Sequence, residues 1–254
     1  MSAYESLAGS YDALTWDVPY EKIAQFFLRV CRRHGCKPAS VLDLACGTGS
    51  LAVLLAKQGL FVLGADCSEQ MLTQASQKSA GMENAPYWIL QKMQHLRLPQ
   101  PVDAVCCCLD SVNYITRPAE LQQALRRVFD ALRPGGVFVF DINTPEKLQG
   151  LDGQVFLDEN EDTYCVWRAE FSAKKRLCRY GIDLFRREGG AWRRSREEHT
   201  EYAYTVEELT QYLTAAGFSA VTVYGDRVLR APEEHALRVW FAAEKQRNTQ
   251  GVRP

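Results

Sequence analysis

The chain of 254 residues lacks a charge imbalance, a long apolar run and any paired-cysteine motif. Its 30 Lys and Arg residues nearly balance its 31 Asp and Glu residues, which leaves a net charge of −1. The whole molecule therefore has no electrostatic preference for nucleic acid or for an anionic membrane. No stretch approaches the ~20 apolar residues of a membrane-spanning helix, and residues 1–14 lack the apolar core of a signal peptide. We therefore expect a soluble, cytoplasmic protein that does not act on membranes.

The nine cysteines follow no disulfide or zinc pattern. None of them makes a Cys-x-x-Cys pair, so the usual zinc-ribbon and redox signatures are missing. Cys106, Cys107 and Cys108 are consecutive, and on a strand their side chains would point alternately to its two faces. We expect reduced, buried cysteines and no metal site.

Apolar runs alternate with amphipathic stretches over the first 142 residues. Four stretches show the apolar spacing of an amphipathic helix, namely 19–34, 50–58, 69–78 and about 121–132. Short, nearly continuous apolar runs predict buried strands at 40–45, 60–65, 87–91, 102–109 and 137–142. The RPGG sequence at 133–136 is typical of a turn before the last strand. The alternation predicts an α/β fold, a doubly wound, mostly parallel Rossmann-like sheet with helices on both faces.

The pattern changes after the fifth strand. Residues 163–203 alternate polar and apolar side chains, with Gly181 and the pair Gly189-Gly190 as turns. This alternation predicts a small antiparallel meander of about three strands. A capping box at 205–208 predicts one more helix, and the apolar runs after it predict a last pair of strands in the main sheet.

The meander is therefore an insertion and not a trailing domain. We expect a main domain made of 1–150 and 204–246, within which 1–38 form N-terminal helices. The insertion spans 151–203 on the substrate side of the molecule, and 247–254 form a loose tail.

The stretch VLDLACGTGS at 41–50 joins a buried strand to a helix through a glycine-rich loop. Such a loop brings bare backbone amides and a helix N-terminus to a ligand at the carboxyl end of a parallel strand. Gly47, Gly49 and Ala52 satisfy the dinucleotide pattern G-x-G-x-x-[G/A], and Asp66 lies nineteen residues after Gly47. No G-K-[ST] follows, so the loop is not a Walker P-loop.

Asp43 favours a cationic ligand over a dinucleotide. A pyrophosphate gains nothing from a carboxylate four residues before the first glycine, whereas a sulfonium or an ammonium group does. S-adenosylmethionine carries both of these cations, and Asp66 suits the two hydroxyls of its ribose. Asp43 could instead be a structural carboxylate of the turn, so both interpretations of the loop stay open at this point.

Together these residues resemble class I S-adenosylmethionine-dependent methyltransferases, and the resemblance runs over most of the chain. DLACGTG resembles motif I of that family, and ADCSEQML resembles its acidic ribose loop. CLDSVNY after the fourth strand and LRPGG before the fifth follow in the same order. The opening Tyr4-x6-Tyr11-Asp12 is similar to the lid helix of the small-molecule branch. The inserted meander also resembles that branch, which includes sugar N-methyltransferases and glycine or sarcosine methylating enzymes.

The resemblance implies that the chain binds S-adenosyl-L-methionine. The residues that would hold its methionine half are Tyr11, Asp43, Ala45, Gly47, Gly49 and Leu109. Asp66 would bind the ribose, and the adenine would meet Cys67, Met71 and the backbone of Met93. Met71 could equally be a plain core residue.

The segment after the third strand departs from the family pattern. Many members have an Asp-Met pair there whose carboxylate accepts a hydrogen bond from the adenine amino group, and this chain has Lys92-Met93. A lysine cannot accept that hydrogen bond. The Gln91 side chain or the Met93 backbone would have to serve the ring.

A methyltransferase aligns an acceptor with a methyl group that is already activated. It needs a general base only when the acceptor arrives protonated. Tyr11, Asp110 and His199 are the residues that we expect to act on the acceptor, and Asn113 and Tyr114 are further pocket candidates. His199 could instead be a hydrogen-bonded structural residue, and Asn113 a cap.

The acceptor class is open to more than one interpretation. An insertion over the pocket mouth suits a small molecule, since it can exclude water and shape a closed cavity. Residues 168–198 carry ten Lys and Arg against five Asp and Glu, so an RNA or protein methyltransferase that docks through this stretch is the alternative. We do not expect nucleic acid, because no aromatic-basic platform is evident. A cofactor-binding protein without catalysis is a third interpretation, motivated by Lys92. The sequence contains no signal for an oligomeric state.

Overall fold

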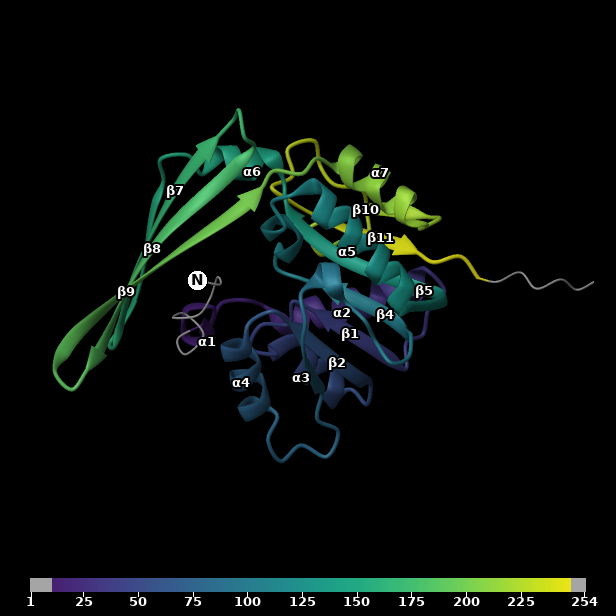
Figure 1. The fold of residues 1–254 in the computed structure, drawn as a ribbon, viewed down its shortest axis with the longest axis horizontal. Helices are drawn as coiled ribbons and strands as arrows, with labels where there is room; N and C mark the ends of the chain where they lie inside the picture. The colour runs from purple at the N-terminus through teal and green to yellow at the C-terminus, as the bar shows by residue number, and fades with distance from the viewer. Residues whose placement is uncertain (1–10, 248–254) are drawn as a thin grey trace, which may run out of the picture.

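Residues 11–247, the part of the chain that the computed structural model describes, form two β-sheets. A seven-stranded sheet is covered by helices, and a four-stranded sheet projects from it (Figure 1). The predicted doubly wound α/β fold with a separate antiparallel sheet is therefore confirmed. Among the described residues, no helix is both long enough and apolar enough to cross a membrane.

The seven-stranded sheet has the order β10-β11-β5-β4-β1-β2-β3. Its strands are β1 (Ser40–Leu44), β2 (Phe61–Asp66), β3 (Tyr87–Leu90), β4 (Val102–Cys107), β5 (Leu132–Asn143), β10 (Val221–Gly225) and β11 (Arg238–Glu244). The strands from β5 to β3 are parallel, and β11 runs antiparallel to both β5 and β10. The predicted last pair of strands is therefore present in the main sheet, and its antiparallel direction is a finding of the structure. The strand order reverses between β1 and β4, and open α/β sheets bind ligands at the carboxyl ends of strands beside such a switch point.

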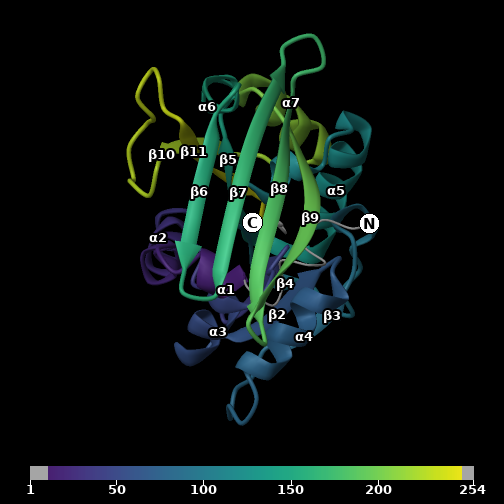
Figure 2. The same cartoon turned by 90° about the vertical axis from the view of Figure 1, so that its left-hand side faces the viewer.

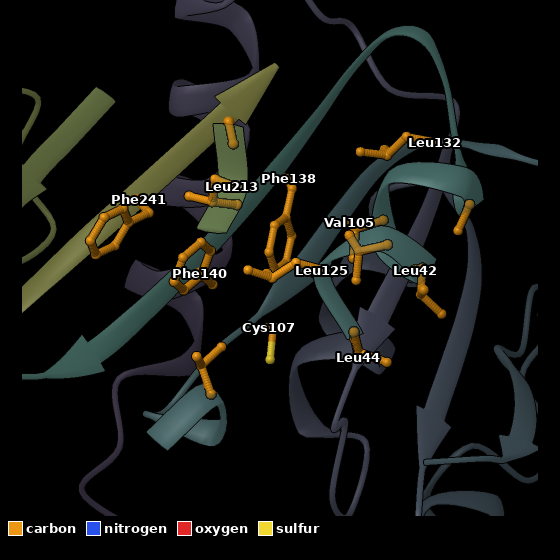
Figure 3. Close-up of a cluster of buried hydrophobic side chains, with 14 of the residues drawn as sticks. Leu42, Leu44, Val105, Cys107, Leu125, Leu132, Phe138, Phe140, Leu213 and Phe241 are labelled. Carbon is orange, nitrogen blue, oxygen red and sulfur yellow. The ribbon is translucent and has the colours of Figure 1, made fainter. Parts of the chain in front are cut away.

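Helices cover both faces of this sheet. The helices are α1 (Tyr11–Leu14), α2 (Tyr20–Arg33), α3 (Ser50–Lys57), α4 (Glu69–Lys78), α5 (Pro118–Ala131), α6 (Pro145–Gly150) and α7 (Val206–Ala216), with short 3-10 turns η1 (Met93–His95) and η2 (Ser111–Tyr114). The apolar sides of α2 and α3 pack on one face, and those of α5 and α7 pack on the other. Figure 3 shows the second cluster, in which Leu125 and Leu213 meet the rings of Phe138, Phe140 and Phe241.

The consecutive cysteines of β4 and the residue after it confirm that both faces are buried. Cys107 belongs to the cluster under α5 and α7, whereas Cys106 and Cys108 belong to the cluster under α2 and α3. This is the alternation predicted for three neighbouring residues on a strand.

The predicted helix starts are also confirmed. Ser68 caps α4, because its Oγ accepts a hydrogen bond from the Met71 amide at 3.2 Å. Thr205 and Glu208 form a capping box at α7, each side chain accepting from the backbone of the other. These local side-chain contacts satisfy amides that the first helical turn leaves without partners.

The four-stranded sheet differs from its prediction in number. It consists of β6 (Val155–Asn160), β7 (Thr163–Ser172), β8 (Leu177–Glu188) and β9 (Ala191–Tyr202), in sequential order (Figure 2). The prediction of about three strands missed β6, because VFLDEN does not alternate and becomes a strand through its pairing with β7. Gly181 lies inside β8, so its prediction as a turn is wrong, whereas Gly189-Gly190 does join β8 to β9.

The RPGG sequence lies at the start of β5 and not before it. Leu132 already pairs with Val102, and the register then shifts so that Val137 pairs with Ala104. Gly135 has a φ of +83°, which is a turn conformation. The predicted turn is thus present as an irregularity within the strand.

Candidate active site

A cavity of about 830 Å³ opens at the carboxyl ends of β1, β2 and β4. Its size lies within the ~300–1,000 Å³ range of ligand pockets. The site residues predicted from the sequence that line it are Tyr11, Asp43, Ala45, Gly47, Asp66, Cys67, Met71, Met93 and Leu109. The structure does not place Gly49, Asp110 or His199 in its lining.

Gly47 and Gly49 both have a positive φ, of 54° and 75°, but they face different surroundings. A Cβ on Gly47 would meet no atom within 4 Å, and its bare backbone borders the cavity. A Cβ on Gly49 would lie 2.4 Å from the Trp88 ring, so the second glycine lets that ring pack behind the loop. Gly47 therefore lies on the cavity side of the loop, whereas Gly49 makes room for the Trp88 ring behind it.

Asp43 brings a buried carboxylate to the cavity wall. It lies in β1 between Gly64 of β2 and Cys106 of β4, and it is 2% exposed. Its Oδ1 accepts a hydrogen bond from the Cys106 thiol at 3.5 Å, whereas its Oδ2 has no hydrogen-bond partner among the described residues. Burial raises the pKa of Asp43 to about 7, although the Cys106 thiol and the Ala52 backbone amide oppose the rise. A cation in the cavity would pair with this carboxylate and lower that pKa again.

Asp66 is fixed at the end of β2 by the backbone. Its Oδ2 accepts from the Gly47 amide at 2.9 Å, and its Oδ1 accepts from the Ser68 amide at 2.8 Å. Burial raises its pKa, although these amides oppose the rise. Because a carboxylate offers about four acceptor positions, Asp66 keeps capacity for further donors such as hydroxyls.

The far end of the cavity is lined by Cys67, Met71 and the segment at 91–94. Met71 is both buried in α4 and part of the wall, so its two sequence interpretations are compatible. The Gln91 side chain already exchanges two hydrogen bonds with the backbone of Arg97, at 2.8 and 3.2 Å. Lys92 is exposed.

The N-terminal segment closes another side of the cavity with Tyr11 and Tyr20. Burial raises the pKa of both hydroxyls, to about 12 for Tyr20 and further for Tyr11, so both stay protonated near neutral pH. Asp12 ties this segment to the glycine-rich loop, because its Oδ1 accepts from the Thr48 hydroxyl at 2.6 Å. Tyr20, the first residue of α2, is not among the site residues predicted from the sequence, since nothing local distinguishes it. Tyr4, the first tyrosine of the predicted lid, lies outside the described residues.

His199 lies in β9, beneath the cavity wall. It is buried, and its Nε2 lies 2.9 Å from Oε2 of Glu197. Its ring meets the edge of Tyr114, which does line the cavity, at a centroid distance of 5.8 Å. His199 therefore contacts a residue of the cavity wall but does not line the cavity itself.

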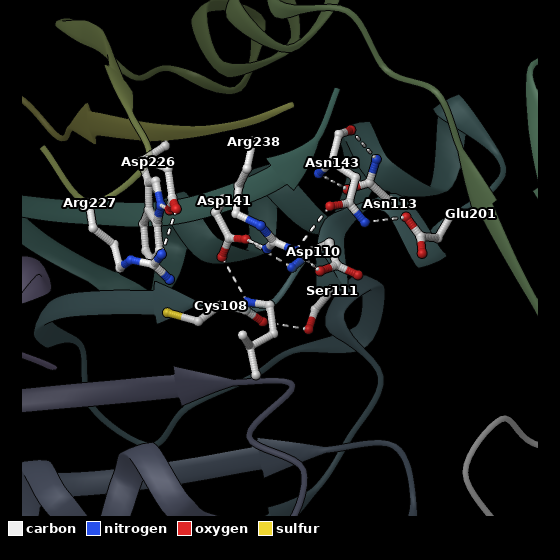
Figure 4. Close-up of polar contacts among 12 residues, drawn as sticks. Cys108, Asp110, Ser111, Asn113, Asp141, Asn143, Glu201, Asp226, Arg227 and Arg238 are labelled. Carbon is white, nitrogen blue, oxygen red and sulfur yellow. Dashed lines mark hydrogen bonds and ion pairs between the residues drawn. The ribbon is translucent and has the colours of Figure 1, made fainter. Parts of the chain in front are cut away.

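Asp110 is turned toward a polar cluster beside the cavity (Figure 4). Its Oδ1 accepts from Arg238 at 2.7 Å, and Arg238 also pairs with Asp141 of β5. Sequence reasoning missed both of these partners. Each lies in an apolar strand sequence, and a single polar residue there does not indicate which side chain it will contact in the fold.

Comparisons with known proteins agree with this geometry. Residues 41–136 match the family model described as a methyltransferase domain. A protein of Geobacillus sp. (strain WCH70) that is named as a methyltransferase is 31% identical over 245 residues, which cover 95% of this chain and 99% of the relative. An S-adenosylmethionine-dependent methyltransferase from Clostridium acetobutylicum ATCC 824 is 30% identical and has a TM-score of 0.86, over 96% of this chain and 100% of that one. The sugar N-methyltransferase KedS8 from Streptoalloteichus sp. ATCC 53650 shares the fold, with 23% identity and a TM-score of 0.75 over 96% and 93% of the two chains.

The fold and the cavity thus define a Rossmann-like α/β protein with a cavity at the switch point of its sheet. The chain belongs to the S-adenosylmethionine-dependent methyltransferase family.

Proposed function

We propose that this chain binds S-adenosyl-L-methionine in the cavity and transfers the methyl group to a small-molecule acceptor by in-line displacement. The observation that carries the proposal is the buried Oδ2 of Asp43, which lies at the wall of an 830 Å³ cavity and has no hydrogen-bond partner within the described residues 11–247. A buried charge persists where a partner compensates it, and the cofactor supplies an ammonium and a sulfonium. The same carboxylate argues against a dinucleotide, whose pyrophosphate it would repel.

The residues around the cavity suit the parts of this cofactor. Asp43, Ala45, Gly47 and Leu109 would hold the methionine half, and Tyr11 would donate to its carboxylate. Asp66 has acceptor capacity for the ribose hydroxyls. Cys67, Met71 and Met93 offer soft, apolar surfaces for the adenine. Because the Gln91 side chain is already hydrogen-bonded to the Arg97 backbone, backbone groups would have to recognise the polar edge of the adenine.

The tyrosines at the methionine end would orient the acceptor. Because burial keeps the Tyr11 and Tyr20 hydroxyls protonated, they would donate hydrogen bonds and would not remove a proton. Good alignment of a nucleophile can lower a barrier by ~7–11 kcal/mol, so positioning is the main contribution that these side chains would make.

A small acceptor is favoured over a nucleic acid by the charges of the four-stranded sheet. Five of the ten basic residues in the 168–198 stretch form ion pairs with carboxylates, namely Arg168, Arg176, Arg193, Arg194 and Arg196. Paired arginines release fewer counterions from a phosphate backbone. KedS8, which shares the fold, is described as a sugar N-methyltransferase. We propose that 151–203 shape the acceptor side and that the main domain binds the cofactor.

Calorimetric titration with S-adenosylhomocysteine tests the cofactor. We expect micromolar binding, about −8 kcal/mol, and a strong loss in Asp66→Ala. Asp130→Asn, an exposed position on α5, should leave it unchanged. Tight binding of NADH without any response to S-adenosylhomocysteine would return the loop to the dinucleotide interpretation.

Labelled-methyl transfer to a cell extract, separated by molecular mass, tests the acceptor. We expect label in the low-mass fraction. Label in RNA or protein would overturn the acceptor class, and no label at all, despite cofactor binding, would indicate a non-catalytic binding protein.

A further inference from the structure

Two consecutive residues after β4 have left-handed backbones although neither is a glycine. Leu109 has a φ of 59° and Asp110 a φ of 51°. Such conformations cost free energy and persist only where the surrounding structure holds them. Leu109 and Ser111, the residues on either side of Asp110, line the cavity. The strained turn is thus part of the wall, on the strand next to the one that carries Asp43.

Asp141 holds this turn by its backbone. It is completely buried in β5, and its two oxygens accept from the amides of Leu109 at 2.7 Å and Asp110 at 3.1 Å. Both amides must point the same way to reach one carboxylate, and the positive φ values allow this.

Arg238 compensates the charges that the turn brings together. One guanidinium donates to Asp141 Oδ2, to Asp110 Oδ1 at 2.7 Å and to Asn143 Oδ1 at 3.0 Å (Figure 4). Without it, two buried or half-buried carboxylates would face each other. Arg238 begins β11, so the last strand of the sheet reaches back to the cavity wall.

The same cluster joins the four-stranded sheet to the turn. The Asn143 side chain donates to Glu201 of β9 at 3.0 Å, while its oxygen accepts from Arg238. Asn113 of η2 donates to the carbonyls of Asn143 and Tyr202. Hydrogen bonds therefore run without interruption from β9 through Asn143 and Arg238 to Asp110.

We propose that Arg238, through Asp141 and Asp110, is a positioning residue that fixes the Leu109–Asp110 turn at the methionine end of the cavity, where the acceptor would also lie, and couples it to the four-stranded sheet. The inference rests on the proposed methyl transfer. It gives Asp110 a role outside direct contact with the acceptor. It also explains why strain is retained where the wall of the cavity must be placed accurately.

The test uses Arg238→Lys, which keeps the charge but cannot bridge three acceptors in one plane. The matched control is Arg133→Lys, because Arg133 pairs with Asp103 at the opposite ends of the same two strands, β5 and β4. Each protein is titrated with S-adenosylhomocysteine, and initial rates of labelled-methyl transfer are measured against dilutions of the low-mass extract fraction. Amide exchange at 109–111 is followed in parallel.

We expect Arg238→Lys to lower the rate per amount of extract at least tenfold and to weaken S-adenosylhomocysteine binding by a clearly smaller factor, because Leu109 is one of several residues that would hold the methionine half. Amide exchange at 109–111 should accelerate in Arg238→Lys. The control Arg133→Lys should change neither the transfer rate, nor the affinity, nor the exchange. Equal losses of transfer rate in both variants, or a wild-type rate in Arg238→Lys, would show that Arg238 does not position the turn and contributes only to the stability of the fold. If Arg238→Lys does not fold, the same measurements are made on Asn143→Ser, which removes the bridge between Arg238 and Glu201. The same outcomes then support or overturn the proposal. Failure of the wild-type protein to bind S-adenosylhomocysteine or to transfer methyl groups would instead refute the proposed function.

Discussion

Two buried aspartates at the same edge of the main sheet differ in what their carboxylates meet. In the part of the chain that the structure describes, one oxygen of Asp43 in β1 has no hydrogen-bond partner, whereas the carboxylate of Asp141 in β5 accepts from two amides and Arg238. Burial raises both pKa values, to about 7 for Asp43 and about 6 for Asp141, where Arg238 opposes the rise. A buried charge without compensating partners destabilises the folded protein. Asp141 therefore stabilises the fold through its partners within the chain, and we infer that Asp43 binds a ligand.

The largest effect on stability is expected when Asp141, the aspartate with partners, is changed. Asp141→Asn should lower the free energy of unfolding by about 3–5 kcal/mol, because one partner of a buried ion pair is lost. The new amide nitrogen also cannot accept from the backbone of Leu109 or Asp110. Urea unfolding measures the loss, with Asp130→Asn as the exposed control. A loss below about 1 kcal/mol would mean that the pair is dispensable.

The same substitution at the unpaired aspartate should act in the opposite direction on stability. Asp43→Asn removes an uncompensated charge, so we expect the ligand-free protein to gain about 1–3 kcal/mol at pH 8. The affinity for S-adenosylhomocysteine should fall about 10–100-fold, since a charge-assisted hydrogen bond of ~1.5–3 kcal/mol is lost. Unfolding and calorimetry on the same preparation measure both quantities. A stability loss together with unchanged affinity would make Asp43 a structural residue.

The pH dependence sharpens the contrast. Because the folded pKa of Asp43 is raised to about 7, the folded state binds a proton that the unfolded state releases near pH 4. The ligand-free protein therefore loses stability through this group as the pH rises from about 4 to about 7. We expect the stability difference between Asp43→Asn and wild type to grow over that interval and then level off. Saturation with S-adenosylhomocysteine should abolish the growth, and a difference independent of pH would contradict the raised pKa.

Local features of both regions could be predicted from the sequence. The glycine-rich loop, the Ser68 cap and the acid at the end of β2 depend on neighbours within a few residues, and the chain order shows them directly. Asp43 was recognisable because a carboxylate so close to a glycine-rich loop is a short-range pattern. Its missing partner could not be read, since absence of a contact depends on the whole fold.

The polar cluster could not be predicted for the same physical reason. Arg238 and Asp110 are 128 residues apart, and they meet only because β11 adds beside β5. Neither residue belongs to a local motif. A single charged residue in an apolar stretch can mark the end of a strand as well as a buried ion pair, so the sequence does not distinguish the two. The four-stranded sheet shows the same limit, because β6 owes its conformation to β7.

The smallest expected effect concerns a carboxylate that is paired but not buried. Asp12 follows Tyr11 and binds Thr48 and Lys78, with its side chain half exposed. Exposed ion pairs contribute about 0–1 kcal/mol, so Asp12→Asn should weaken S-adenosylhomocysteine binding only about two- to fivefold. Salt screens such pairs, and wild type should approach the variant in concentrated NaCl. Glu233→Gln, which breaks the exposed pair with Arg230, serves as the control without effect. A loss above tenfold would show that Asp12 belongs with Asp43 among the residues that hold the ligand, because solvent exposure would then have failed to weaken its contribution.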